Sequence, residues 1–442
     1  MKRTLTPAPV PRVLRAALRP FQAFFRTQTS SSILLLAATG AAFAWANSRW
    51  SESYHHLLEQ VIAIQVFGHA LSWPLHHWVN DALMAVFFFV VGMEIKRELV
   101  LGELAEVRRA ILPAIAAAGG MAVPAAIFLI WNSSGPGARG WGVPVATDIA
   151  FALGCLAVLR GRVPPSLGVF LTALAIFDDL GAILIIALFY GGTVNVEAIA
   201  VVGGLVVALV VLNRYGVRRA WPYLVLGVAL WVAFLASGLH ATLAGVVLGL
   251  CIPARPRRAP DDIAPLVVDL GRLIDWQPGL GHQLGAQAEQ VLEAHLADTQ
   301  APLDRLLHAL HPWVAFGVVP VFALANAGVE LANASIAVVT QSVTVGVALG
   351  LFLGKQVGIF LATFLAVKLR ICPMPSEATW RQVHGIAVLG GIGFTMSLFI
   401  GALALGEYPE LATQAKVGIL LGSATSAIVG LALLRGASRR QA

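Results

Sequence analysis

The chain has 442 residues, of which 58% are hydrophobic and only 12% are charged, and its mean hydropathy is +0.80. So few charged residues cannot cover the surface of a soluble protein of this length. The composition therefore excludes a soluble globular protein and predicts one that crosses a membrane several times. A net charge of +7 alone would also suit a protein that binds nucleic acid, but the positions of the basic residues argue against that class.

The first 30 residues are basic and contain proline, which predicts a cytoplasmic tail (1–30) rather than a cleaved signal peptide. Apolar segments follow, most of them long enough for the roughly 20 residues that a bilayer requires. They lie at 31–48, 79–99, 109–131, 143–159, 166–190, 196–213, 221–236, 239–252, 312–329, 340–367, 384–404 and 415–434. We therefore predict an all-α polytopic membrane protein with twelve transmembrane helices. Its parts are transmembrane helices 1–8 in 31–252, a cytoplasmic loop at 253–305, helices 9–12 in 306–435 and a cytoplasmic tail at 436–442.

Basic residues fall almost entirely on one side of this predicted arrangement. With the N-terminus in the cytoplasm, only Arg49, Arg139 and Lys416 of the 30 Lys and Arg residues fall in outer segments, and Lys355 lies inside a span. Cytoplasmic loops of membrane proteins carry an excess of Lys and Arg. The distribution supports twelve spans in a lipid bilayer with both termini in the cytoplasm, and it gives no indication of nucleic acid as a partner.

Two loops carry enough pattern for a structural prediction. The outer loop 49–78 contains the run VIAIQVF before Gly68, which fits a small β-hairpin that contacts a second copy in a homodimer, or an irregular loop equally well. The cytoplasmic loop 253–305 has two stretches with apolar residues at helical spacing. It predicts two short amphipathic helices against the membrane face.

Two of the predicted spans are interrupted by residues that break helices. The span 143–159 has Pro144 as its second residue and continues into Thr147 and Asp148, and the span 384–404 contains GGIGFT at 390–395. Each is the middle member of a run of three spans, and the two runs have inverted topology, which is typical of the midplane site of a transporter. Glycines for close helix packing would explain the second segment, but they do not explain Asp148 in the first.

Adjacent carboxylates, Asp178 and Asp179, stand in the apolar run 167–190. One Asp at mid-membrane costs roughly 2.5–3.5 kcal/mol on insertion scales. Two neighbouring carboxylates also repel each other unless a proton or a cation neutralises them. Their oxygens suit a hard cation such as Na⁺ or Li⁺. The pair is therefore predicted to bind either the cation or protons, and a structural pair satisfied by Ser or Thr is the alternative.

Other charged residues lie in or beside the predicted spans. Lys355 needs a counter-charge within an apolar segment, for which Asp148, Asp178 and Asp179 are candidates, unless its ammonium reaches the interface. Asp148 follows Thr147 in a helix break, where an Asp offsets the positive end of a half-helix, so we expect it to balance charge rather than bind the ion.

Asp81 and Glu94 stand at the two ends of one span and are either interfacial charges or part of an acidic cytoplasmic entrance. His240, His308 and His311 lie near predicted interfaces and are candidates for pH sensing, although most such histidines have no such role.

Two other functions use similar features. An intramembrane aspartyl protease has two buried Asp residues, but on different helices and with one in a Gly-x-Gly-Asp context, whereas Asp178 and Asp179 are adjacent and lack that context. A Na⁺-coupled symporter of organic solutes shares the interrupted helices, but it needs a polar, aromatic-lined cavity for which the sequence gives no clear signal. The chain has no ATP-binding motif, so we expect a transporter without a cofactor and not an enzyme.

The motifs taken together resemble the NhaA family of bacterial Na⁺/H⁺ antiporters over roughly 30–435. The matching strings are VNDALMAVFFF at 79–89, GMEIKREL at 92–99, ATDIAFALG at 146–154, AIFDDLGA at 175–182, SGLHAT at 237–242, LHPW at 310–313, NAGV at 326–329 and GK at 354–355. The resemblance implies alternating-access exchange of cytoplasmic Na⁺ or Li⁺ for external protons across the bacterial inner membrane. It also implies regulation by pH, and exchange that is electrogenic if two protons return for each Na⁺.

The resemblance also implies roles for single residues. Asp178 and Asp179 match the pair that binds the ion and carries protons, Asp179 being the more central ligand, and Lys355 matches the lysine that pairs with the first Asp. Thr147 and Asp148 match the crossing of the two interrupted helices.

Three further positions match functional residues of the family. Asp81 matches a carboxylate important for transport, Glu94 the acid at the cytoplasmic entrance, and His240 a histidine linked to the pH response.

The chain departs from the family pattern at Leu307, which stands where an acidic residue precedes the histidines before Pro312. We therefore expect the ion link from this loop to Lys96 or Arg97 to be missing, which leaves the pH-activation profile open. The loop 253–305 also looks longer than the family requires.

Overall fold

The computed structural model describes residues 30–66, 69–159, 162–256, 300–329 and 336–438. Within these residues, eight helices are long and apolar enough to cross a membrane, or up to eleven if three bent helix pairs count as one span each. The prediction of an all-α polytopic membrane protein is confirmed. Twelve spans and the inverted repeat stay predictions, and the apolar helix Thr242–Cys251 in the eighth predicted span has only 10 residues.

The chain folds into two compact units, which we describe separately. The first comprises Met1–Asn80, Val107–Tyr190 and Val319–Ala442. Its described elements are the helix Ser30–Ala46, α2 (Ser51–Glu59), β1 (Val61–Val66), β2 (His69–Pro74), α3 (Leu75–Trp78), α5 (Val107–Trp131), η3 (Pro136–Val145), α6 (Ile149–Val158), α7 (Pro165–Phe189), α14 (Val319–Asn326), η6 (Ile336–Thr340), α15 (Ser342–Leu349), η7 (Gly350–Gly354), α16 (Lys355–Lys368), α17 (Trp380–Leu389), α18 (Phe394–Leu405) and α19 (Pro409–Ser438).

The second unit comprises Asp81–Glu106 and Gly191–Val318. Its elements are α4 (Met84–Val100), η2 (Glu103–Ala105), α8 (Val196–Arg214), α9 (Ala220–Ser237), α10 (Thr242–Cys251), α13 (Pro302–Trp313) and η5 (Val314–Val318), while the π-helical turn η1 (Val79–Leu83) crosses the boundary between the units. α13 begins inside the predicted loop 253–305, since Pro302 occupies a first-turn position that proline favours. The two predicted amphipathic helices of that loop fall largely on 257–299, outside the described residues.

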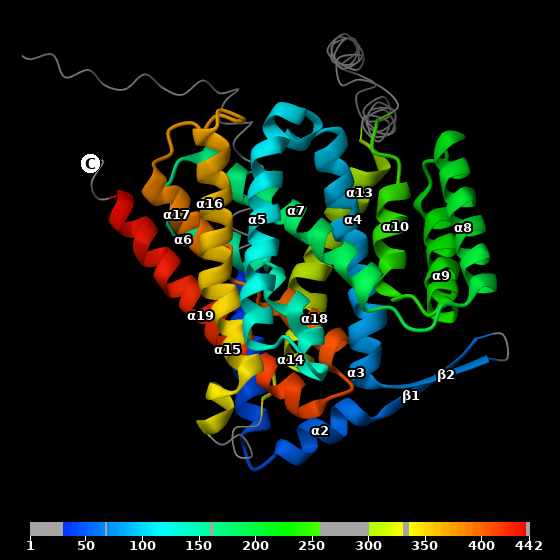
Figure 1. Ribbon diagram of the computed structural model, residues 1–442. Coiled ribbons are helices and arrows are strands. Elements are labelled where there is room, and N and C mark those ends of the chain that lie inside the picture. The colour runs from blue at the N-terminus through cyan, green and yellow to red at the C-terminus, as the bar shows by residue number, and fades with distance from the viewer. Residues whose placement is uncertain (1–29, 67–68, 160–161, 257–299, 330–335, 439–442) are drawn as a thin grey trace, which may run out of the picture. The chain divides into compact units, whose positions relative to one another are not determined.

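Glycines set the closest helix contacts in both units. In the first unit α5 and α16 lie side by side, and a Cβ at Gly119 or Gly358 would collide with the backbone of the opposite helix (Figure 1). In the second unit Gly245 and Gly249 of α10 bring its backbone against α4 in the same way. Such small residues let helices approach closely where no hydrophobic effect drives them together.

Both predicted interruptions are present as helix breaks in the first unit. The axis bends by 41° between η3 and α6 and by 43° between α17 and α18. Pro144 precedes the first break, and Gly390–Gly393 form the second, so residues that disfavour a continuous helix lie at each bend.

Among the described residues, π-helical turns interrupt three of the long helices. The third, η7, ends directly before Lys355, and the first contains Asp81. Such turns occur often at functional sites, so their positions favour Asp81 and Lys355 as candidate site residues.

The outer loop 49–78 contains α2, the β1–β2 hairpin and the short helix α3. β1 and β2 pair antiparallel from Val61 opposite Pro74 to Val66 opposite His69. The hairpin alternative is therefore confirmed, whereas α2 was not predicted. Val61 is 65% exposed on the hairpin, but its use as a dimer contact stays a prediction.

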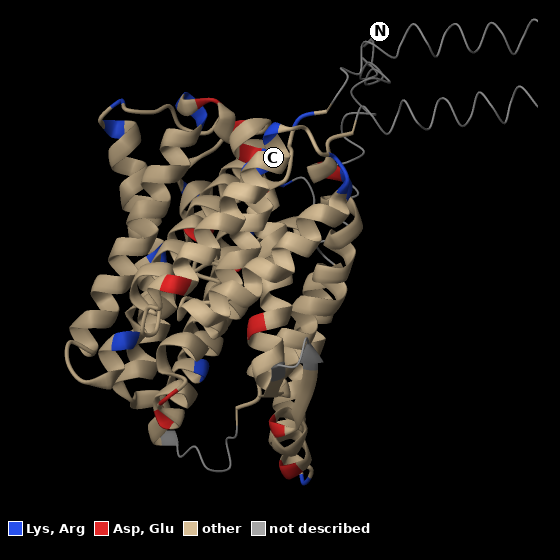
Figure 2. Cartoon of the chain, turned by 90° about the vertical axis from the view of Figure 1, so that its right-hand side faces the viewer, with Lys and Arg blue, Asp and Glu red and all other residues tan. Residues whose placement is uncertain are grey.

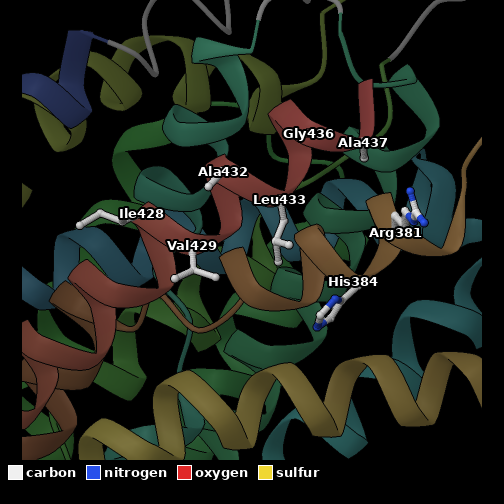
Figure 3. A pocket seen from close by; sticks show the side chains of 8 residues that line it. All are labelled: Arg381, His384, Ile428, Val429, Ala432, Leu433, Gly436 and Ala437. Carbon is white, nitrogen blue, oxygen red and sulfur yellow. The ribbon is translucent and has the colours of Figure 1, made fainter. Parts of the chain in front are cut away.

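Charged residues are sparse along the helices, and most of their ribbon length is tan in Figure 2. A groove of about 550 Å³ runs between α17 and α19 (Figure 3). It is lined by Arg381 and His384 of α17 and by apolar residues of α19, and His384 bonds the Gln356 side chain of α16 at 2.7 Å. None of the predicted site residues lines this groove.

Candidate functional site

Lys355 and Asp178 form an ion pair inside the first unit. Lys355 Nζ lies 2.5 Å from Asp178 Oδ2, and both side chains have no exposed surface. The lysine sits at the first position of α16 and the carboxylate on the middle turns of α7, so two helices are tied through their charges. Of the three carboxylates considered as counter-charges, Asp178 is the one in direct contact.

The neighbouring Asp179 is also buried, with 3% of its surface exposed. Lys355 interacts with its charge as well, so one ammonium faces two carboxylates. The second oxygen of Asp178, Oδ1, is buried and lacks a hydrogen bond of good geometry to any described residue. Buried carboxylate oxygens on neighbouring residues can bind a proton or a hard cation.

The two helix breaks touch each other beside this pair. Asp148 N donates to Ile392 O at 2.6 Å, and Thr147 Oγ1 donates to Gly390 O at 2.7 Å. The carbonyl groups of Gly390 and Ile392, which follow α17, thus accept hydrogen bonds from the other broken span. Thr147 also lies beside the Asp178 carboxylate. The orphan groups that a helix break leaves are in this way partly satisfied by the opposite break.

Asp148 caps two helices at once. Its Oδ1 accepts from Phe151 N at 2.9 Å as the N-cap of α6, and its Oδ2 accepts from the backbone N and the hydroxyl of Thr395 in the first turn of α18. A negative side chain is stabilised at a helix amino end, where the amide dipoles point their positive ends. All of these contacts are with amides and a hydroxyl, and the expected role of Asp148 in balancing charge stays a prediction.

The remaining predicted site residues belong to the second unit. Asp81 is partly buried in η1 and Glu94 is partly buried on α4. His240 lies in the turn before α10, while His308 and His311 lie one turn apart on α13, where His308 Nδ1 bonds Asp304 O at 2.9 Å.

The expectation that an ion link to Lys96 or Arg97 is missing is wrong. Arg97 Nε lies 3.3 Å from Asp304 Oδ1, although Leu307 itself is buried. Asp304 stands three residues before Leu307 on α13, so it lies on the same side of the helix one turn earlier. Lys96 instead donates to Leu250 O at 2.8 Å and to Ile252 O, which satisfies the carbonyl end of α10.

Sequence reasoning missed two participants in the site. Thr395 was quoted only as the end of the GGIGFT string, yet it donates twice to Asp148. Its place just after a glycine-rich break, at the start of a helix, was the available signal. The π-helical turn before Lys355 had no comparable sequence signature.

Comparison with known proteins gives consistent results along almost the whole chain. The family described as Na⁺/H⁺ antiporter 1 matches residues 22–434. A protein named Na(+)/H(+) antiporter NhaA from Anaeromyxobacter sp. (strain Fw109-5) is 48% identical over 433 residues, which are 97% of this chain and 94% of that protein. The protein of that name from Acidithiobacillus ferrooxidans is 47% identical over 96% of this chain and 99% of its own length. Na(+)/H(+) antiporter NhaA 1 of Myxococcus xanthus is 46% identical over 97% of this chain and 95% of its own.

Proposed function

This chain belongs to the Na⁺/H⁺ antiporter 1 family, and on that basis we propose that it exchanges Na⁺ for protons across a bacterial membrane. It is a transporter and not an enzyme. The observation that carries the proposal is the buried pair Asp178 and Asp179 facing Lys355 in a helix long and apolar enough to span a bilayer. Ionised carboxylates bind a hard cation and neutral ones hold protons, so one site serves both substrates in turn.

Asp179 is the main oxygen ligand of the ion in this proposal. Asp178 alternates between Lys355 and the transported charge, a role supported by the ion pair on its Oδ2 and the unsatisfied Oδ1. When the ion binds, part of the attraction between Asp178 and Lys355 is replaced by attraction to the cation. Because cation and protons exclude one another at these oxygens, their exchange is coupled without a covalent step.

Alternating access at a helix crossing is the proposed route of exchange. Open to the cytoplasm, the pair releases protons and binds Na⁺; open to the outside, protons displace Na⁺. If both carboxylates return protonated, two protons enter for each Na⁺ that leaves, and the membrane potential then helps to drive exchange. Asp148 and Thr147 keep the half-helix ends balanced while the crossing moves, as supported by their contacts with the second break.

Residues of the second unit are proposed to serve the path and its regulation. Glu94 attracts cations at the cytoplasmic entrance and Asp81 assists transport, as their match to the family motifs suggests. His240, His308 and His311 are proposed pH sensors, because imidazole changes its charge in the physiological range.

We further propose that Li⁺ is accepted in place of Na⁺, since the same hard oxygen ligands suit both. The protein is expected in the bacterial inner membrane with both termini in the cytoplasm, as the distribution of basic residues favours. The exposed β1–β2 hairpin is the proposed contact of a homodimer.

The comparisons do not favour symport of organic solutes or intramembrane proteolysis. The relatives are named antiporters, and Asp178 and Asp179 lie on one helix rather than on two.

The direct test uses everted membrane vesicles that carry a preformed pH gradient. Na⁺ and Li⁺ should collapse the gradient, and K⁺ at the same concentration should leave it intact, across a series of pH values. Vesicles from cells without the protein are the control. Gradients that stay intact with Na⁺ at every pH would contradict antiport.

A further inference from the structure

Ser423 of α19 bonds the amino end of α18 at the helix crossing. Its Oγ accepts from Gly393 N at 3.3 Å and from Phe394 N at 3.1 Å. Ser423 is 5% exposed and stands about 30 positions further along the chain, so this is a tertiary contact within the first unit and not a local cap.

Ser423 and Asp148 accept hydrogen bonds from different backbone N–H groups at the amino end of α18. The opening N–H groups of a helix have no partner inside it and carry partial positive charge. Ser423 holds those of Gly393 and Phe394, while Asp148 holds that of Thr395. A neutral hydroxyl therefore satisfies two amides that would otherwise compete for the Asp148 carboxylate.

Two glycines place α19 where this contact is possible. A Cβ at Gly422 would lie 2.9 Å from Leu351 Cβ in η7, and one at Gly430 would lie 2.7 Å from Leu389 Cδ2 at the end of α17. The helix thus lies tightly against both the turn that precedes Lys355 and the second break. The close contacts at Gly422 and Gly430 lie on either side of Ser423 along α19 and fix the position of its hydroxyl.

We propose that Ser423 is a positioning residue for ion exchange: it fixes the amino end of α18, so that Asp148 and Thr395 keep their contact at the helix crossing next to Thr147. This deepens the proposed antiport function and rests on it. Without the hydroxyl, the two amides would take water or the Asp148 carboxylate as acceptor in a dry site. Either choice changes the charge balance at the helix crossing, where Thr147 lies beside Asp178, and weakens Na⁺ binding more than it slows turnover.

Two hydroxyls of the same helix provide matched controls. Ser426 lies one turn further on, is fully buried, and its Oγ makes no hydrogen bond to a described residue. Thr425 bonds only within α19, to Leu421 O, on an exposed side. Replacing either hydroxyl removes similar atoms from α19 without touching the amides of α18.

The test compares Ser423→Ala, Ser426→Ala and Thr425→Ala in proteoliposomes. Loss of a hydrogen bond is worth about 0.5–1.5 kcal/mol, so we expect Ser423→Ala to raise the apparent KM for Na⁺ about threefold to tenfold, with a smaller change in maximal rate. The two controls should stay within twofold of the unsubstituted protein. Equal KM values for Ser423→Ala and Ser426→Ala, whether both raised or both unchanged, would overturn the proposal.

Hydrogen–deuterium exchange gives a second readout that needs no transport. Fragments covering 390–396 should be protected in the unsubstituted protein and should exchange faster in Ser423→Ala, while fragments from the body of α18 stay unchanged. Rapid exchange at Gly393 and Phe394 in the unsubstituted protein would overturn the proposal even if the variant failed to fold. Protected amides in a protein that moves no protons with Na⁺ would instead contradict the proposed function.

Discussion

Lys355 of α16 and Asp178 of α7 are 177 positions apart in sequence, yet the ammonium lies 2.5 Å from the carboxylate and neither side chain is exposed. Burying two charges is unfavourable unless each compensates the other. The pair therefore couples the stability of the fold to a residue that we propose to bind the ion.

Removing one partner should destabilise the protein more than removing both. We expect Lys355→Ala to lower the free energy of unfolding by about 3–5 kcal/mol, because it leaves the Asp178 charge buried alone unless it takes up a proton. The double variant with Asp178→Asn should recover most of that loss without recovering transport. Thermal unfolding in detergent measures the stabilities, and additive losses in the double variant would speak against a direct pair.

Loss of the Asp148 side chain should destabilise the amino ends of both α6 and α18. Asp148→Ala removes the acceptor of Phe151 N and of both Thr395 donors, so we expect a loss of about 1–3 kcal/mol in unfolding free energy. Asp148→Asn keeps one acceptor oxygen and should lose less, while still slowing transport because the charge is gone. If the Asn variant transported Na⁺ at the normal rate, the role of Asp148 in charge balance would be wrong.

The Arg97–Asp304 contact should affect regulation more than stability. Both side chains are partly exposed, at 52% and 29%, and pairs of this kind contribute about 0–1 kcal/mol. We expect Asp304→Asn to shift the pH at which exchange reaches half its maximum, with unfolding changed by less than about 1 kcal/mol. Arg305→Gln, an exposed change on the next residue, is the control and should leave the pH profile in place.

Acid should inhibit exchange by competition. A proton bound to Asp178 or Asp179 excludes Na⁺, so the apparent KM for Na⁺ should rise as the pH falls, and sufficient Na⁺ should restore the rate. Initial rates over a grid of pH and Na⁺ concentration distinguish the cases. A falling maximal rate at constant KM would mean that protons act at another place.

The two interruptions were predictable because their causes are local. Pro144 and the glycines of 390–393 disfavour a continuous helix, and close helix packing would not explain Asp148 in such a break. The β-hairpin was predictable only as one of two alternatives, since six-residue strands leave a short pattern.

The partner of a charged residue is set by contacts between segments that are distant in sequence. The spacing of apolar residues along the chain does not predict such contacts. Spacing alone left three carboxylates open for Lys355, and only the family resemblance indicated Asp178. The acid that contacts Arg97 is Asp304, one helical turn before Leu307, and its position differs from the one that the family pattern predicts. The sequence has no signal for Ser423, because its bond to Phe394 N forms only when α19 packs against the break.

The most direct test of the ion site is Asp179→Asn in everted vesicles, at matched amounts of protein in the membrane. Asparagine keeps the size of the side chain but neither ionises nor carries a proton, so Na⁺ should no longer collapse the pH gradient, while insertion into the membrane stays normal. Na⁺-dependent proton movement at the unsubstituted rate in this variant would contradict the assignment of Asp179 as the ion ligand.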